Sequence, residues 1–203
     1  IEAAGERAAG ATLYVSLEPC AHTGRTGPCA DAVIAAGIAK VVAPIEDPNP
    51  LVSGEGFRKL REAEIEVEID ARYAAAASKL NEAFIHFIHH KRPFVTLKSA
   101  LTLDGKIAAP IDNDGWITSE RARAHVQTLR HSSDCILTGI GTVLADDCLL
   151  TDRTGLPRSR PLYRIVLDSQ LRLPVGSQIV KSCQNDLLVV TTSAANPDRR
   201  AAL

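Results

Sequence analysis

The sequence contains no methionine and has few aromatic side chains. Only 4% of its 203 residues are Phe, Trp or Tyr, and there is a single Trp. It also lacks an apolar run long enough to span a membrane and has no segment resembling a signal peptide. These absences argue against a membrane protein and an exported one, and we expect a cytoplasmic location.

A surplus of positive charge is also missing. The chain has 23 Lys and Arg against 24 Asp and Glu, for a formal net charge of −1. Non-specific nucleic-acid binding depends on Lys and Arg neutralising phosphates, so nucleic acid is not an expected partner. A local basic pocket for one phosphate stays compatible with this balance. The 45% hydrophobic and 23% charged content is typical of a globular protein with a core.

The five cysteines form an odd, scattered set: Cys20, Cys29, Cys135, Cys148 and Cys183. Without an export signal, such a set indicates reduced thiols rather than disulfides. Cys20 and Cys29 are close enough in sequence to share a metal ion. The chain opens at Ile1 inside a predicted helix and stops at Leu203 in an Ala-rich stretch. We therefore expect both ends to be cut.

Short strands and helices alternate along the first half of the chain. The hydrophobic pattern predicts strands at 12–17, 40–45 and 65–69, and helices at 2–9, 29–36, 55–64 and 71–90. This alternation predicts an α/β sandwich. The pattern changes near Lys91-Arg92-Pro93, which predicts one domain over 1–91 and a second over 92–203.

The second half is also predicted to be α/β. Strands are expected at 94–101, 135–138, 164–167 and 187–190, with turns or loops at 104–105 and 112–115. Ser119 is a good N-cap for a helix through about His131. Gly139 to Leu144 predicts a glycine-containing turn that opens a helix, where free main-chain amides attract phosphate.

The strongest motif has two Pro-Cys pairs, Pro19-Cys20 and Pro28-Cys29, on either side of a loop. The loop can fold back so that both sulfurs meet one ion. Cys29 begins a predicted helix, where the helix dipole favours a thiolate. Two thiolates, one imidazole and an open position would form a catalytic zinc site. Zinc lowers the pKa of its bound water, and a separate Glu shuttles protons.

This motif resembles the cytidine-deaminase-like zinc signature, but with eight residues between the cysteines instead of two. The longer loop and Asp47-Pro48-Asn49-Pro50 are similar to the deaminase of the bifunctional riboflavin-biosynthesis family. The resemblance implies a cytidine-deaminase-like, three-layer α/β/α fold for the first domain. The resemblance implies that Cys20 and Cys29 bind Zn²⁺ and that His22, Arg25, Asp47 and Asn49 contact substrate. It also implies a His-Ala-Glu triplet on the preceding helix, which we expect before Ile1. Glu2, Glu6 and Glu18 are interpreted as surface or framework carboxylates. We therefore expect the 203-residue chain alone not to deaminate.

Residues 93–153 and 165–169 resemble the reductase of the same family, which has a dihydrofolate-reductase-like fold. The matching runs are Lys98 to Ala108, Trp116 to Ser119, Thr138 to Asp147 and Ile165 to Ser169. The resemblance implies NADPH contacts at Ala100, Trp116, Thr118, Thr142, Asp146 and Ser169. It implies substrate contacts at Lys98, Asp114, Arg130, Leu150 and Arg153. The two arginines suit a phosphate or ribose by their fork geometry. The front half of the reductase is present, so we expect an incomplete NADPH pocket.

The resemblance as a whole implies a two-step enzyme of riboflavin biosynthesis. It would hydrolytically deaminate 2,5-diamino-6-ribosylamino-4(3H)-pyrimidinone 5′-phosphate over zinc. It would then reduce the ribose of 5-amino-6-(5-phosphoribosylamino)uracil to ribityl with NADPH. The family also suggests a homo-oligomer. Two alternatives stay open: another zinc nucleoside or tRNA deaminase with an unrelated tail, and a non-catalytic zinc-binding module. His86, His89 and His90 are interpreted as a helix end and not a metal site.

Overall fold

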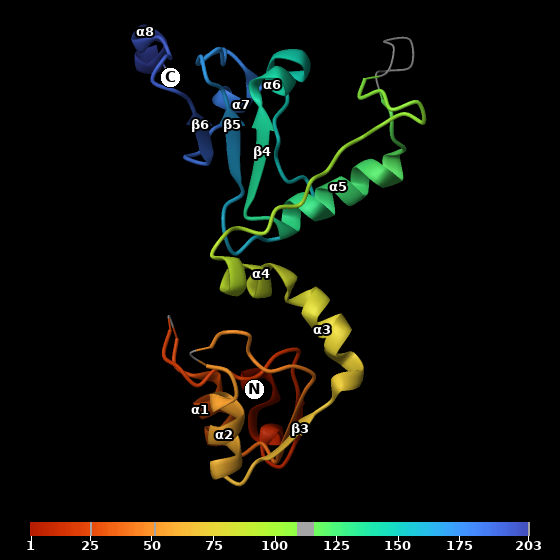
Figure 1. Cartoon of the computed structure of the whole chain (residues 1–203), viewed down its shortest axis with the longest axis vertical. Coiled ribbons are helices and arrows are strands. Elements are labelled where there is room, and N and C mark those ends of the chain that lie inside the picture. Colours follow the sequence, from red (N-terminus) through yellow and green to blue (C-terminus); the bar gives the residue numbers. More distant parts are fainter. Residues whose placement is uncertain (25, 51, 109–115, 203) are drawn as a thin grey trace. The chain divides into compact units, whose positions relative to one another are not determined.

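The computed structural model describes residues 1–24, 26–50, 52–108 and 116–202 (Figure 1). The chain forms two compact units, Ile1–Leu97 and Lys98–Leu203. Each unit contains a three-stranded, entirely parallel sheet whose neighbouring strands are joined by helices. The predicted α/β class is confirmed. The predicted loop at 112–115 lies outside the described residues.

The first unit is built on a β-α-β-α-β run. Its elements are β1 (Thr12–Tyr14), α1 (Cys29–Ala35), β2 (Lys40–Ala43), α2 (Glu55–Glu62) and β3 (Glu66–Ile69). The central strand β2 pairs with both others, with Val41 opposite Leu13 and Val67. Val41 and Leu60 are fully buried and join Val33 of α1 in one core. Because β1 and β2 are parallel neighbours, the loops that follow them leave the sheet at the same edge.

Three elements of this unit differ from the sequence prediction. The first helix is a 3-10 helix, η1 (Glu2–Ala8), that is interrupted at Gly5, where φ is 55°. The strand predicted over 12–17 ends at Tyr14 because the chain then turns into the Cys-bearing loop. The helix predicted over 71–90 consists of η2 (Ala71–Tyr73), α3 (Ala74–Leu80) and α4 (Glu82–His90). Asn81 separates α3 from α4, and its side-chain amide donates to the carbonyl of Ala77.

The second unit repeats the β-α-β-α-β order. It contains α5 (Glu120–Ser132), β4 (Cys135–Gly139), α6 (Ile140–Asp146), β5 (Tyr163–Leu167), α7 (Gln178–Lys181), β6 (Leu187–Val190) and α8 (Pro197–Ala202). Val166, Leu173 and Ile179 are buried between the sheet and its helices. The N-cap prediction is confirmed, since Ser119 Oγ accepts a hydrogen bond from the N–H of Ala122.

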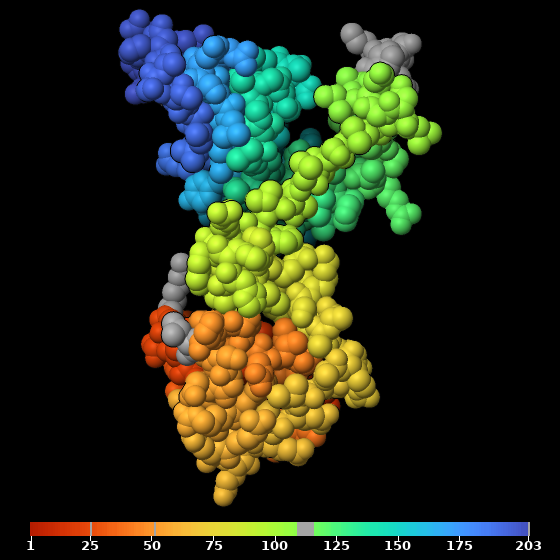
Figure 2. Space-filling model, viewed as in Figure 1, coloured from red at the N-terminus to blue at the C-terminus, as the bar shows by residue number. Residues whose placement is uncertain are grey.

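The strand predicted at 94–101 is wrong in this structure. The segment has no regular secondary structure, and its apolar side chains are exposed, with Val95 79% and Leu97 91% accessible. This segment is coloured yellow-green in Figure 2. An extended, β-branched sequence becomes a strand only when a partner strand accepts its main-chain hydrogen bonds. The turn predicted at 104–105 is confirmed, because the N–H of Thr102 donates to the carbonyl of Lys106 across it.

No helix among the described residues is long and apolar enough to span a membrane.

Candidate functional site

The two predicted zinc ligands lie together at the start of α1. The main-chain N–H of Cys29 donates to Cys20 Sγ at 3.3 Å. The next N–H, of Ala30, donates to the carbonyl of Cys20 at 3.1 Å. The loop between the cysteines therefore folds back as the motif predicts. The pKa of the Cys29 thiol is raised, mainly by its hydrogen bond with the Cys20 thiol and to a smaller extent by burial. Two adjacent thiols resist losing both protons unless a cation neutralises the second charge.

The donor set at this point suits zinc. Two sulfur ligands are available, and both are free cysteines. Among the described residues, no third His, Cys, Asp or Glu joins them to form a metal-binding group. His22 is exposed and does not complete the set. The described part of the chain therefore offers two of the four positions of a tetrahedral site.

The predicted substrate-contact residues follow β1 and β2, whose carboxyl ends lie side by side. Asp47 is buried, and its Oδ1 accepts a hydrogen bond from the N–H of Asn49 at 2.8 Å, which closes a tight turn. His22 lies in the exposed loop between the cysteines, and Arg25 lies outside the described residues. Parallel strands typically present their ligand sites at this edge of the sheet.

Glu18 connects these two loops. It is 3% exposed and accepts hydrogen bonds from four main-chain N–H groups, of Asp47, Gly54, Gly56 and Phe57. The interpretation as a framework carboxylate, rather than a surface one, fits this position. Its partners lie 29 to 39 residues away along the chain, so no local sequence signal identifies them.

The predicted cofactor contacts of the second unit lie partly at one edge of its sheet. Thr142 and Asp146 are on α6, which starts where β4 ends, and Ser169 follows β5. Because Gly139 is opposite Leu167 in the parallel register, these strand ends are adjacent. A Cβ placed at Gly139 or Gly141 would meet nothing within 4 Å. The main chain here is therefore open to a ligand, which suits the phosphates of a dinucleotide.

Trp116 and Thr118 are held by an arginine that the sequence analysis did not single out. The guanidinium of Arg123 lies 4.4 Å from the centre of the Trp116 ring, and it also donates to the carbonyl of Thr118. Both contacts come from the first turn of α5. Lys98 is exposed and Ala100 is half-buried in the irregular segment before α5. Asp114 lies outside the described residues.

The two arginines predicted to bind substrate lie near each other. Arg130 donates to the carbonyl of Thr151 at 2.9 Å, and the N–H of Arg153 donates to Gln127 Oε1 at 3.0 Å. Burial, and then the charge of Arg153, lower the pKa of Arg130. Two neighbouring cations repel each other unless an anion lies between them, so their placement suits a phosphate group.

Leu150 differs from the other predicted contacts. Its side chain is 9% exposed and belongs to the hydrophobic core of the second unit. Its φ of 55° turns the chain from the end of α6 toward Arg153. A side chain within the core is unavailable to a polar ligand, so only the main chain of Leu150 is left for the predicted role.

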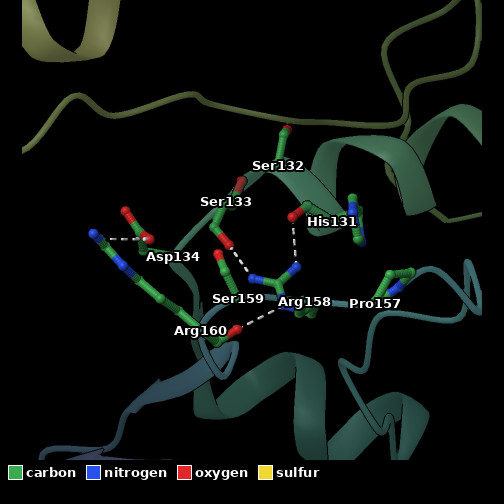
Figure 3. Close-up of a pocket in the computed structure, with 8 residues that line it drawn as sticks. All are labelled: His131, Ser132, Ser133, Asp134, Pro157, Arg158, Ser159 and Arg160. Carbon is green, nitrogen blue, oxygen red and sulfur yellow. Dashed lines mark hydrogen bonds and ion pairs between the residues drawn. The ribbon is translucent and has the colours of Figure 1, made fainter. Parts of the chain in front are cut away.

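A polar hollow of about 260 Å³ lies at the end of α5, away from the predicted contacts on α6 and after β5 (Figure 3). The guanidinium of Arg158 points into it and donates to the carbonyls of Arg130, His131 and Ser133. Arg130 and His131 lie in the last turn of α5, where carbonyls have no intrahelical N–H donor, and Ser133 follows the helix. The carbonyl of Arg130 also accepts from the N–H of Ser133 at 3.3 Å. Arg158 therefore caps α5. We interpret the hollow as part of this capping arrangement and not as a ligand site.

Two buried charged residues, one on β5 and one directly after it, were not singled out in the sequence analysis. Arg164 is 1% exposed and pairs with Asp186 at 2.8 Å, while Asp168 is 1% exposed and accepts from the N–H of Leu173 at 2.8 Å. Alternate residues of β5 face the core, so Arg164 lies on the same side as the buried Val166. This alternation is the sequence signal that could have identified Arg164 as buried. Asp168 precedes Ser169 and holds the turn after the strand.

Known proteins match both units. Residues 93–203, more than half of the chain, match the family model "RibD C-terminal domain", and residues 1–44 match "Cytidine and deoxycytidylate deaminase zinc-binding region". The riboflavin biosynthesis protein RibD of Aquifex aeolicus is 45% identical over 188 residues, 93% of this chain and 52% of the relative. RibD of Bacillus amyloliquefaciens is 42% identical over 206 residues, 100% of this chain and 55% of the relative.

Solved structures give the same result. Acinetobacter baumannii RibD aligns with a TM-score of 0.81 at 41% identity, covering 98% of this chain and 56% of that one. A Thermotoga maritima deaminase/reductase, whose name gives both enzymatic steps, aligns with a TM-score of 0.76 at 41% identity, covering 94% and 54%. The chain spans about half the length of the relatives it matches. On the family-model match and these relatives, the chain belongs to the RibD family.

Proposed function

We propose that this chain acts in riboflavin biosynthesis as part of a two-step deaminase–reductase. The first step is hydrolytic deamination of 2,5-diamino-6-ribosylamino-4(3H)-pyrimidinone 5′-phosphate, assigned to residues 1–91. The second is NADPH reduction of the ribose of 5-amino-6-(5-phosphoribosylamino)uracil, assigned to residues 92–203. The pairing of Cys20 with Cys29 at the start of α1 carries the proposal. The Thermotoga maritima relative is named for these two reactions.

In the first step, Cys20 and Cys29 would hold zinc, whose role is to supply hydroxide near neutral pH. Main-chain hydrogen bonds preset the position of Cys20, so little ordering is needed when the metal binds. Asp47 and Asn49 would orient the base or sugar, with His22 and Arg25 at the ribose or phosphate. A further imidazole and a proton-shuttling Glu are required from outside the described residues.

In the second step, the chain's task is to orient two ligands. NADPH supplies the hydride. Ala100, Trp116, Thr118, Thr142, Asp146 and Ser169 would bind it, the last three at the open edge beside Gly139 and Gly141. Arg130 and Arg153, with Lys98, Asp114 and the main chain of Leu150, would hold the phosphorylated ribose. The closeness of the two arginines supports an anionic ligand.

Metal analysis and cofactor titration test the two halves separately. We expect the chain to bind Co²⁺ or Zn²⁺ through two thiolates, and the full-length protein to bind NADPH. A metal site closed by four protein ligands in the full-length protein would instead favour a non-catalytic zinc module. Metal binding without any NADPH binding would favour a different zinc deaminase with an unrelated tail.

A small phosphorylated pyrimidine ribotide is thus the proposed partner, in a cytoplasmic homo-oligomer. Size-exclusion chromatography with light scattering tests the self-association.

A further inference from the structure

Glu18 is a buried carboxylate whose partners are all main-chain amides. Oε2 accepts from the N–H of Asp47 at 3.0 Å and of Gly54 at 2.9 Å. Oε1 accepts from the N–H of Gly56 at 2.7 Å and of Phe57 at 3.2 Å. The last three donors belong to the N-cap and first turn of α2, where free N–H groups favour a negative charge.

The contact between Glu18 and α2 is close. A Cβ on Gly56 would lie 1.9 Å from the carbonyl oxygen of Pro19 and 3.0 Å from Glu18 Oε1. The first turn of α2 therefore lies directly against the Pro19–Cys20 peptide. A side chain at position 56 would push α2 away from the loop that carries Cys20.

Glu18 connects the loop that carries Cys20 to the turn at 47–49. It lies two residues before Cys20, while Asp47 both donates to its carboxylate and closes the turn with Asn49. The N–H of Glu18 also donates to the carbonyl of Ile45 at 3.2 Å. A displacement of Glu18 would thus shift the turn at 47–49 relative to the cysteine pair.

We propose that Glu18 is a positioning residue of the deaminase site: its four amide contacts hold the substrate-contact turn at 47–49 in register with the Cys20–Cys29 pair. This inference rests on the proposed function. Both carboxylate oxygens already accept two hydrogen bonds, so Glu18 has no free position for a metal or a substrate proton. Its effect reaches the reaction through Asp47 and Asn49.

The cysteine pair itself is held from another side. The N–H groups of Cys29 and Ala30, in α1, donate to Cys20. Loss of the Glu18 anchor should therefore leave metal binding nearly intact while it weakens ligand binding. A purely structural role would affect both together, because unfolding of the unit separates the two cysteines.

The test compares wild type, Glu18→Gln and Glu46→Gln. Gln has nearly the same shape as Glu, but its amide nitrogen cannot accept and would face two N–H donors. Glu46 is an exposed carboxylate adjacent to Asp47 and serves as the matched control. Three quantities are measured on the full-length protein: hydrogen exchange of the 46–57 peptides, Co²⁺ titration followed by thiolate-to-cobalt absorption, and the change of that absorption with the diaminopyrimidinone ribotide.

For Glu18→Gln we expect exchange of the 46–57 amides to rise about tenfold or more. We expect Co²⁺ affinity to stay within about threefold and the ribotide affinity to fall about tenfold or more. Glu46→Gln should match wild type throughout. Equal ribotide affinity in Glu18→Gln and wild type would overturn the inference, as would parallel loss of Co²⁺ and ribotide binding.

Two further outcomes are also decisive. If Glu18→Gln does not fold, Glu18→Asp keeps the charge on a shorter arm and should show the same split at smaller amplitude; its absence would overturn the inference. If wild type and Glu46→Gln bind Co²⁺ but show no response to the ribotide, the deaminase assignment fails and the positioning role in deamination fails with it. If instead wild type and Glu18→Gln respond equally to the ribotide, the deaminase assignment stands and only the positioning role of Glu18 fails.

Discussion

Cys20 and Cys29 meet because α1 begins at Cys29. The first two N–H groups of this helix donate to the sulfur and the carbonyl of Cys20. These contacts bring the two thiols, the predicted metal ligands at either end of an eight-residue loop, to one point. The metal affinity of this region should therefore depend on both sulfurs.

We predict that Cys29→Ser abolishes the thiolate-to-cobalt absorption of the chain, because a hydroxyl is a poor ligand for this type of site. Co²⁺ titration with absorption spectroscopy measures it. Cys183→Ser, which changes an exposed free cysteine of the second unit, should leave the titration unchanged. Unaltered absorption in Cys29→Ser would contradict the assigned ligand.

Asp152 offers a pH-dependent test at the same scale. Hydrogen bonds from Thr154, first its main-chain N–H, and then from His131 and Arg158 hold the pKa of this carboxyl far below its usual range. A depressed pKa stabilises the fold above the unfolded-state value of about 3.9, and this contribution is lost as pH falls toward the folded-state pKa. Asp152→Asn should thus be less stable than wild type at pH 7.

The stability difference between wild type and Asp152→Asn should be full above about pH 5 and shrink on acidification below about pH 4. Denaturant unfolding at several pH values measures this. Asp104→Asn, a change in an exposed turn of the same unit, should show no comparable trend. A gap that is constant with pH would show that the ionised carboxylate does not stabilise the fold.

At the scale of elements, helix ends decide much of the local structure. Ser119 begins α5 as its N-cap. Arg158 ends the helix by donating to the carbonyls of Arg130, His131 and Ser133, of which the last two are drawn in Figure 3. The start is a local signal, because Ser119 and the N–H donor that it caps, Ala122, are three residues apart. The end is not local, because Arg158 comes from a loop 25 to 28 residues further along the chain.

We predict that Arg158→Ala lowers the free energy of unfolding by about 1–3 kcal/mol, because the carbonyls at the end of α5 lose charge-assisted partners. Denaturant unfolding gives the magnitude, and hydrogen exchange in the last turn of α5 gives the location. Arg160→Ala should cost less than about 1 kcal/mol, since Arg160 forms a single exposed ion pair at 3.8 Å with Asp134. Equal effects of the two variants would contradict the capping role.

At the scale of the whole molecule, each unit has a core of its own. Leu60 is fully buried in the first unit, and Leu173 is 1% exposed in the second. Leu60→Ala and Leu173→Ala should each cost about 2–5 kcal/mol through lost contacts and a cavity. Hydrogen exchange by mass spectrometry should show faster exchange in the mutated unit. Faster exchange confined to the other unit would contradict this division of the core.

The sequence by itself predicted the α/β class, the N-cap of α5 and the two-cysteine motif. These features depend on residues a few positions apart, where periodicity and capping act directly. Family resemblance added the substrate and cofactor contacts, whose roles are still proposals. The strand expected at 94–101 was wrong because a strand needs a partner as well as a suitable composition.

Only the tertiary structure decided which distant residues serve the site. Glu18 gains its role from amides that lie up to 39 residues away, Leu150 turns its side chain into the core, and Arg123 reaches Trp116 from α5. Such contacts form when packing brings separate segments together, and burial then requires each polar group to find a partner. Local sequence carries the types of these groups, but their pairing depends on the folded chain.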